Sequence, residues 1–463
     1  MPTPHLDPRD PETRIARLLD DGKFEFLIPR TDCGMVAVTG DIKGNKVIVF
    51  ASDATIKSGA LGVEGSKVIV SAYKAAMSAQ VPIIGIWHSG GARLSDGVAS
   101  LDAFGEVFQS MISASGRIPQ LSLVLGPTAG GGAYGPALTD IVVLSPEGRI
   151  FVTGPEVVKS VTGEDIDMAL LGGPEAHRKN SGLAHIIAPT EQEAIDDVRD
   201  LTALFANHGV MNPDVADIDL SVFVPESQVR TYEVHPLVDA ILDKETEHIE
   251  LLSMWAPNMT TIIGRLGGAT VGVLANNPAH IAGILDAAAG EKAARFVRTC
   301  DAFGIPLIVI ADVQGFLPGA GQEWEGAVRR GAKLLHAFGE AVVPRVTLIT
   351  RRAYGGAYVA MNSKALGATR VLAWPEAEVS VMGAVAAVRV LHRRILADLP
   401  AEQRESMELE LAADHEKISG GVARAVEIGA VDEIIDPAHT RSALAKIIAS
   451  TPHRRGAHGN IPL

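Results

Sequence analysis

Short apolar runs alternate with longer segments of helical spacing along much of this chain. The runs at 81–87 (VPIIGIW) and 305–313 (IPLIVIADV) have the length of strands and almost no polar positions. Such runs predict strands of a sheet that is covered on both faces. Segments 66–80 and 291–304 carry apolar residues at helical spacing, and the second ends at Gly304, a residue type that commonly ends helices. The alternation predicts a layered α/β fold.

The pattern of the first half recurs in the second half. Val47 of KVIVFASDA maps onto Val271 of TVGVLANNP, 224 residues further on. The same offset relates Gly59 to Gly283, Gly91 to Gly315, and the Gly-Gly-Ala-Tyr segment 131–134 to 355–358. Beyond these pairs the offset grows to 229, where Gly154 faces Gly383. An offset that is held over four separate motifs predicts two copies of one domain.

Length and composition agree with two domains. A chain of 463 residues exceeds one ordinary core, and we place the domains at 1–228 and 229–463, because apolar periodicity lapses between 224 and 236. With 47% apolar residues the chain reads as a soluble, densely packed protein. No apolar run is long enough to span a bilayer, and the polar start lacks the features of a signal peptide. We therefore expect a cytoplasmic protein.

Charge and metal-binding residues exclude several classes of function. A net charge of −14 argues against nucleic acid, whose phosphates need a basic surface. Two cysteines, Cys33 and Cys300, exclude a disulfide scaffold and a CxxC zinc module. The 14 histidines are scattered and form no HExxH motif. We therefore expect no metal.

The glycine-rich segments TAGGGAYG (128–135) and YGGAY (354–358) are the strongest candidates for chemistry. A glycine turn between a buried strand and a helix exposes free backbone N–H groups, which suit an anion or a developing oxyanion. Each turn taken alone is explained by tight packing, but turns duplicated at matching places favour a site. Neither turn contains the phosphate-binding GxxxxGK[ST] motif.

Other constellations are weaker. Ser89 follows His88, but its flanks do not fit the GxSxG nucleophile elbow. Glu323 and Glu325 could form an acid/base pair, although a solvated loop, or ion pairs with the two arginines that follow at 329 and 330, is the simpler interpretation. Arg93 suits a phosphate, a carboxylate or a surface salt bridge equally well.

Several motifs together resemble one family. SGGARL, FVTGPEVVKSVTGED, EKAARFVRTCDAFGIP, GFLPG, RRGAKLL, YGGAY and VMGA, in this order, closely resemble the carboxyltransferase (β) subunit of biotin-dependent acyl-CoA carboxylases, above all the actinobacterial acetyl-/propionyl-CoA carboxylase β chains. The resemblance implies two tandem crotonase-like domains, that is, ββα-superhelix domains. It also implies a homo-hexamer, a trimer of dimers, whose active sites lie between the N-domain of one subunit and the C-domain of its partner.

The resemblance also implies the site residues. One oxyanion site would be formed by the amides of Gly130 and Gly131, and the other by those of Gly383 and Ala384. Further positions would contact the substrates: Gly59, Gly62, Gly65, Ser89, Gly90, Gly91, Ala92 and Arg93 on the CoA side, with Gly355, Gly356 and Ala386 in the second half. Ala386, small and apolar, is compatible with acetyl- or propionyl-CoA.

The implied chemistry explains what the chain lacks. Carboxybiotin on a carrier protein would deliver the carboxyl group and leave a basic ureido group, so that no side-chain base or metal is needed. The chain has no Met-Lys-Met biotinylation site and no ATP-binding glycine loop, which implies a separate α subunit with biotin carboxylase and carrier functions. Malonyl- or methylmalonyl-CoA would be the product. A biotin-dependent decarboxylase or transcarboxylase and a silent CoA-binding scaffold remain alternatives.

Two departures from the family pattern are visible. Gln314 replaces the usual proline of DVPGFLPG, and Thr128 replaces a common cysteine. Neither position carries a proposed amide donor. The zinc ribbon of split bacterial acetyl-CoA enzymes is also missing, which favours the longer β type.

Overall fold

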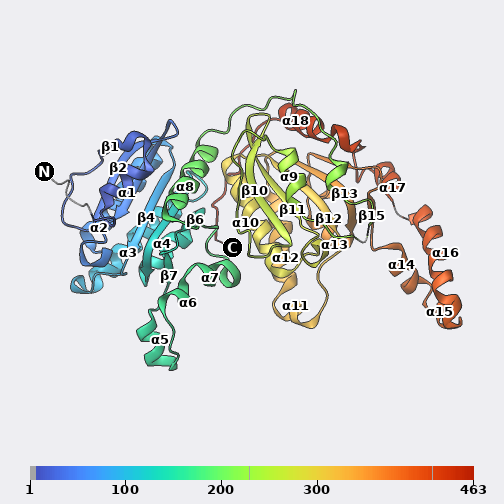
Figure 1. Ribbon diagram of the computed structural model, residues 1–463, viewed down its shortest axis with the longest axis horizontal. Helices are drawn as coiled ribbons and strands as arrows, with labels where there is room; N and C mark the ends of the chain where they lie inside the picture. The colour runs from blue at the N-terminus through green and yellow to red at the C-terminus, as the bar shows by residue number, and fades with distance from the viewer. Residues whose placement is uncertain (1–6, 229, 420, 463) are drawn as a thin grey trace. The chain divides into compact units, whose positions relative to one another are not determined.

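The computed structural model describes residues 7–228, 230–419 and 421–462, and the polypeptide forms two compact units (Figure 1). Unit 1 comprises the described residues up to His208, together with Ile249–Trp255 and Ala457–Pro462. Unit 2 comprises Gly209–His248 and Ala256–Gly456. Residues 1–6, where we expect no signal peptide, lie outside the described part, as does residue 229 at the predicted domain boundary.

Unit 1 is built on one twisted sheet with the strand order β1-β2-β3-β4-β5-β6-β8, and β7 pairs with β5. The first three strands are antiparallel, and the strands from β3 to β8 are parallel. Their bounds are β1 Phe24–Phe26, β2 Met35–Ile42, β3 Asn45–Ser52, β4 Ile83–Ser89, β5 Gln120–Ala129, β6 Ile141–Leu144, β7 Arg149–Phe151 and β8 Ile186–Ile187. The helices are α1 Pro11–Leu18, α2 Val63–Ala79, α3 Val98–Ala114, α4 Gly131–Leu138, α5 Pro155–Thr162, α6 Met168–Gly172, α7 Pro174–Ala176 and α8 Glu191–Ala206.

Unit 2 repeats this plan with the strand order β16-β14-β13-β12-β11-β10, and β15 pairs with β13. Its strands are β10 Met259–Leu266, β11 Ala269–Asn276, β12 Leu307–Val313, β13 Arg345–Tyr354, β14 Arg370–Ala373, β15 Glu378–Ser380 and β16 Glu433–Ile434. The short strand β9, Ile249–Glu250, belongs to unit 1. Its helices are α9 His235–Ile241, α10 Ala287–Phe303, α11 Ala320–Trp324, α12 Ala327–Glu340, α13 Gly355–Ala360, α14 Ala384–Leu391, α15 Arg393–Ala397, α16 Ala401–Ser419, α17 Val422–Glu427 and α18 Thr440–Ser450.

The predicted duplication is confirmed strand by strand. β2, β3 and β4 lie 224 residues before β10, β11 and β12, and helices α2 and α10 both span 17 residues at the same offset. Helix α10 ends before Gly304, whose φ of 75° is left-handed, as predicted. β6, β7 and α5 precede β14, β15 and α14 by 229 residues. Both apolar runs that predicted strands form the parallel strands β4 and β12.

One part of the predicted alignment is wrong by a single residue. β5 and β13 are related by an offset of 225, and their pairings with β7 and β15 agree with this offset. Gly130 and Gly355, both with a φ of 59°, therefore occupy the same place in the two units. The repeated Gly-Gly-Ala-Tyr sequence instead pairs Gly131 with Gly355, at the offset of 224. The structural offset is 225 here, because unit 2 has one additional residue before β13. Because Gly130, Gly131 and Gly132 are identical neighbours, a shift of one residue still aligns glycine with glycine, and the sequence alone does not reveal it.

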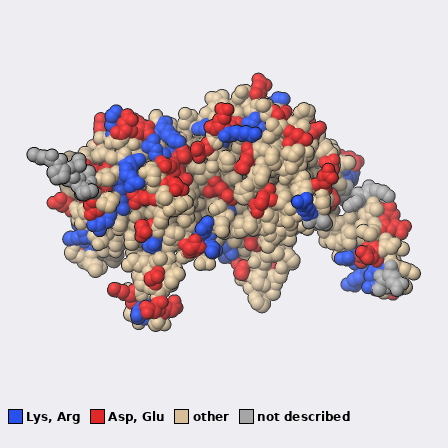
Figure 2. All heavy atoms as spheres, viewed as in Figure 1, with Lys and Arg blue, Asp and Glu red and all other residues tan. Residues whose placement is uncertain are grey.

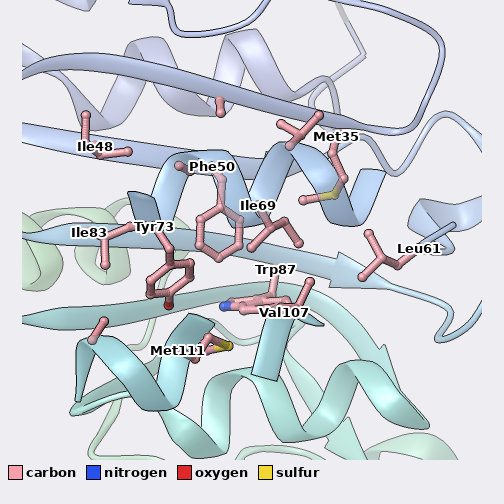
Figure 3. Packing of buried hydrophobic residues seen from close by; sticks show 14 of the residues in the cluster. Met35, Ile48, Phe50, Leu61, Ile69, Tyr73, Ile83, Trp87, Val107 and Met111 are labelled. Carbon is pink, nitrogen blue, oxygen red and sulfur yellow. The ribbon is translucent and has the colours of Figure 1, made fainter. Parts of the chain in front are cut away.

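The core of unit 1 explains why its sheet strands are so apolar. Phe50, Trp87 and Tyr73 are almost completely buried between the sheet and helices α2 and α3 (Figure 3). The Phe50 and Trp87 rings meet edge to face, with centroids 5.2 Å apart. The indole N–H of Trp87 donates to Ser122 Oγ at 2.9 Å, so this buried polar atom is satisfied. The packing holds the carboxyl ends of β4 and β5, which carry the glycine turns.

The surface and the helices add two observations. On the face shown in Figure 2, acidic and basic side chains are interspersed. Within the described ranges, no helix combines the length and the apolar character that crossing a membrane requires.

Candidate active site

The turn between β5 and α4 presents backbone donors at the carboxyl end of the unit 1 sheet. Gly130 turns the chain with φ 59° and ψ −132°, a conformation that favours glycine. Its own N–H is already engaged, because it donates to the carbonyl of Phe151 at 3.1 Å. Gly131 and Gly132 are the first two residues of α4, and their N–H groups have no acceptor among the described residues. The free donor pair is thus displaced by one residue from the predicted pair of Gly130 and Gly131.

The predicted CoA-side segments come together beside this turn. Gly90 N–H donates to Ser58 O at 2.9 Å, and Leu61 N–H donates to Gly91 O at 2.9 Å. A Cβ at Gly91 would lie 3.0 Å from Ala129 O, next to the turn. The structure therefore gathers the segment from Gly59, Ser89 to Ala92, and the donor turn within unit 1. Gly62 and Gly65 allow close packing instead, against Asp96 and Met35 respectively.

Ser89 and Arg93 hold this loop in place. Ser89 is buried, and its Oγ accepts the Gly91 N–H at 3.2 Å, so it is not presented as a nucleophile. The Arg93 guanidinium donates to Cys33 O at 2.7 Å and to Ala60 O at 3.2 Å. Among the described residues Arg93 therefore forms neither a surface salt bridge nor a contact with an anion; it binds two backbone carbonyls. Its cation instead ties the loop to the start of β2.

Gly59→Ala is expected to destabilise unit 1 by about 3 kcal/mol or more, because strain from a left-handed backbone adds to a backbone clash. Gly59 has a φ of +71°, and an added Cβ would lie 1.9 Å from His88 O. Gly44 is the matched control, since its φ is +75° but nothing lies within 4 Å of an added Cβ. Gly44→Ala should lose only about 1–2 kcal/mol. Urea unfolding checks both variants, and equal losses would contradict the close contact at Gly59.

Unit 2 brings its two predicted turns together. A Cβ at Gly355 would lie 3.0 Å from Val381 O, and one at Gly383 would lie 3.6 Å from the Tyr354 ring. Ala384 is the first residue of α14, and neither its N–H nor that of Gly383 has an acceptor within the described part of the chain. The Tyr354 hydroxyl bonds to Glu378 on the neighbouring β15. Gly356 and Ala386 are exposed near these turns.

The duplicated turns differ in one decisive residue. Gly383 and Ala384 correspond to Gly154 and Pro155 in unit 1, at the offset of 229. Pro155 is the first residue of α5 and has no N–H to donate. The α14 turn can therefore offer a donor that the α5 turn cannot. Sequence alignment of the two halves could have revealed this difference, because Gly154 and Gly383 were already paired.

The other candidates show no arrangement for catalysis among the described residues. Glu323 and Glu325 are exposed, on or just after α11. Arg330 pairs instead with Glu291, at 2.5 Å, so one of the considered ion pairs is not formed. No group of three or more His, Cys, Asp or Glu side chains that could hold a metal occurs in residues 7–228, 230–419 and 421–462. The chemistry offered by the described turns is hydrogen-bond donation.

Both units also expose apolar side chains close to the turns. On and before α14 these are Val381, Met382, Val390 and Leu391, and around α5 they are Val152, Val157 and Val161. Helix α5 has no buried residue. Exposed apolar patches of this kind mark surfaces that bind a partner or a ligand.

Comparisons with known proteins identify the family of the chain. A family model described as the carboxyl transferase domain matches residues 15–458. The biotin-dependent acetyl-/propionyl-coenzyme A carboxylase beta6 subunit of Mycobacterium tuberculosis is 58% identical over 461 residues, covering 99% of this chain and 98% of that protein. The propionyl-CoA carboxylase beta chain of Rhodococcus erythropolis is 51% identical over 463 residues, covering 99% of this chain and 97% of that protein.

Solved structures show the same architecture. Transcarboxylase 12S, described as a hexamer with methylmalonyl-coenzyme A and methylmalonic acid bound, matches with a TM-score of 0.90 at 35% identity, covering 98% of this chain and 92% of that chain. A single-chain, multi-domain long-chain acyl-CoA carboxylase shares the fold, with a TM-score of 0.81 at 24% identity over 94% of this chain and 46% of that chain.

Proposed function

Since the chain belongs to the carboxyl transferase domain family and has two tandem crotonase-like domains, we propose that it is the carboxyltransferase subunit of a biotin-dependent acyl-CoA carboxylase. It moves a carboxyl group to the α-carbon of an acyl-CoA thioester. The names of the relatives favour acetyl- and propionyl-CoA as substrates, with malonyl- and methylmalonyl-CoA as products. The observation that carries the proposal is the family match over residues 15–458 of a chain whose donor turns are free.

The residues of this chain act through their backbones. We assign the N–H groups of Gly131 and Gly132, in place of Gly130 and Gly131, to the thioester oxygen, where negative charge develops as the α-proton leaves. The loop from Ser89 to Ala92 and the turn at Gly59 line the CoA side, and Gly62, Gly65 and Arg93 hold these segments in place. These donors lie at a fixed helix start, so they need no rearrangement during the reaction.

The second half suits the biotin side. Carboxybiotin, carried on a partner subunit, supplies the carboxyl group when it is bound. The free N–H groups of Gly383 and Ala384 fit a ureido oxygen, and the exposed Val381 and Met382 beside them fit an apolar ring. Gly355 shapes this turn and Ala386 lies one helical step further on. We assign the segments 1–228 and 229–463 to the CoA side and the biotin side respectively.

Assembly follows from the exposed helices. We propose a hexamer built as a trimer of dimers, in which the N-terminal half of one subunit faces the C-terminal half of its partner. The relative transcarboxylase 12S is described as a hexamer, and the apolar surfaces of α5 and α14 need partners to cover them. An α subunit with biotin carboxylase and carrier functions completes the enzyme.

The test combines the purified chain with an α subunit that carries biotin, ATP, bicarbonate and either acetyl- or propionyl-CoA. We expect malonyl- or methylmalonyl-CoA to form, and no product to form when the α subunit is left out. Mass spectrometry of the CoA thioesters measures both. Absence of product with every α subunit supplied would favour the scaffold alternative. Carboxyl transfer from methylmalonyl-CoA to another acceptor, independent of ATP, would favour the transcarboxylase, to which the chain is 35% identical.

A further inference from the structure

Unit 1 contains a cavity of about 590 Å³ that the proposed reaction does not use. It lies against β4 and β5 beside the helices α1 and α6, and its lining includes Arg14, His88, Gly126, Pro127 and Met168. His88 and Ser89 are neighbours in sequence, but Ser89 contacts the start of α4 and His88 contacts α1. The cavity is therefore separate from the donor turn.

Arg14 is a buried cation that no carboxylate of the described residues contacts. Its relative exposure is 3%. One guanidinium nitrogen donates to His88 Nδ1 at 3.3 Å, and the buried Nε has no hydrogen-bond partner. No carboxylate of the described residues lies within 4 Å of this guanidinium. Burial lowers the pKa of Arg14, and the charges of Glu191 and Asp7 oppose this only in part. A buried charge without a counterion in contact is strongly unfavourable, so this arrangement favours a bound anion.

His88 cannot supply the missing charge. Burial, followed by the nearby Arg14, lowers the pKa of His88 from its usual value to about 4. The imidazole is therefore neutral at pH 7 and accepts the Arg14 hydrogen bond through Nδ1. The His88 ring packs directly against Gly126, so that a Cβ added at Gly126 would lie 2.4 Å from Nδ1.

The other charged groups that line the cavity have partners of their own. Arg9 pairs with Asp7 at 2.8 Å, and Glu191 pairs with Arg17. Asp167 accepts the Leu170 N–H at the start of α6. Arg149 donates to Pro146 O and Gly148 O, and Glu147 lies 3.9 Å from Arg149. Among the described charged residues of this lining, Arg14 is the cation that no carboxylate contacts, although Glu191 and Asp7 act on it at longer range.

At the corresponding position of unit 2, buried arginines are paired with a carboxylate. Asp312 corresponds to His88 at the offset of 224, and Arg351 and Arg352 correspond to Gly126 and Pro127 at the offset of 225. Asp312 is fully buried, and its carboxylate accepts from Arg351 at 2.8 Å and from Arg352 at 3.1 Å. Unit 1 lacks the two arginine side chains, which leaves space, and it lacks the carboxylate, which leaves Arg14 unpaired.

We propose that this cavity binds an oxyanion, the carboxylate or phosphate group of a small molecule, which pairs with Arg14 as Asp312 pairs with Arg351 in unit 2. Residues 1–6 contain no Asp or Glu, so their side chains offer no carboxylate for this role. The space beyond the guanidinium accommodates more than the anionic group alone. This site is additional to the carboxyl transfer proposed above.

The test measures thermal unfolding of the full chain in inorganic phosphate, acetate or coenzyme A, at constant ionic strength set with chloride. At an anion concentration one hundred times its Kd, we expect the unfolding midpoint to rise by about 5 °C. His88→Asp places a carboxylate oxygen where Nδ1 now accepts from Arg14. This variant should melt higher than the wild type without added anion and lose the response to the anion.

Two further variants separate the site from general salt effects. Arg14→Met should lose the response while remaining at least as stable as the wild type in chloride, because it removes an unpaired buried charge. Lys67→Met, which removes an exposed cation of α2 that does not line the cavity, should keep the response. A response to phosphate or acetate that Arg14→Met loses identifies a free small anion. Coenzyme A also binds at the proposed acyl-CoA site, so only the part of its response that Arg14→Met removes identifies a nucleotide phosphate in this cavity. The proposal would be overturned if none of the three ligands gave a larger shift in the wild type than in Arg14→Met. None of these readouts depends on carboxyl transfer.

Discussion

Ala384→Pro is expected to lower kcat for carboxyl transfer by about 100- to 1000-fold, because it removes one backbone donor to a developing oxyanion. Ala384 is the first residue of α14, where its N–H has no acceptor among the described residues. Proline is tolerated at this position of a helix, since the missing N–H belongs to no intrahelical bond. The measurement is the rate of malonyl- or methylmalonyl-CoA formation with the α subunit, at saturating acyl-CoA.

The chain supplies its own control for folding. Pro155 stands at the corresponding position of unit 1 and follows Gly154 as Ala384 follows Gly383, so the turn accepts proline without loss of the fold. Circular dichroism and size-exclusion chromatography of Ala384→Pro should match the wild type. Ala384→Gly keeps the N–H and should retain most of the rate. If Ala384→Pro folds normally and works at the wild-type rate, the donor has been misassigned.

Asp312→Ala is expected to destabilise unit 2 by about 3–5 kcal/mol, the usual loss when one partner of a buried ion pair is removed. The carboxylate is fully buried and holds the guanidiniums of Arg351 and Arg352, which are themselves almost completely buried. Without it, two cations remain inside the unit with no carboxylate of the described residues in contact. Thermal unfolding, followed by calorimetry, measures the loss.

An exposed ion pair provides the comparison for Asp312. Glu64 and Lys67 lie 2.7 Å apart on the surface of α2, where both side chains are more than half exposed. Glu64→Ala should change stability by less than about 1 kcal/mol, since exposed pairs contribute little. Losses of the same size for both variants would show that Asp312 does not neutralise the buried arginines. A second transition confined to unit 2 would locate the effect.

The architecture and the family could be predicted from the residues themselves. Buried strands such as 305–313 are recognised because nearly every position is apolar when both faces of a sheet are covered. The duplication was visible because each copy needs the same glycines where the chain turns under a neighbouring strand, as at Gly59 and Gly283, both left-handed. Both requirements, apolar strands and glycine at left-handed turns, are local, so each can be recognised within a few residues of the sequence.

The donor turns were predicted only in part, for a reason of geometry. Gly130 to Gly132 read as three equivalent donors in sequence, but the N–H of Gly130 bonds to Phe151 on β7. Which N–H is free depends on a strand that arrives twenty residues later and on its register with β5. For the same reason Arg93 was read as an anion ligand or a surface residue, although its partners, Cys33 O and Ala60 O, lie far from it in the sequence.

What the sequence determined by itself was therefore the class of fold, the two copies, the family and the neighbourhood of the proposed site. Only the tertiary structure decided which backbone donors are free, that the copies shift by one residue before β13, and that Arg14 is buried beside a neutral His88. The pattern of apolar residues that predicts strands and helices is a local property of the sequence. Hydrogen-bond and charge pairing are decided between distant segments, because a polar group in the interior is satisfied only by what the fold brings within about 3 Å of it.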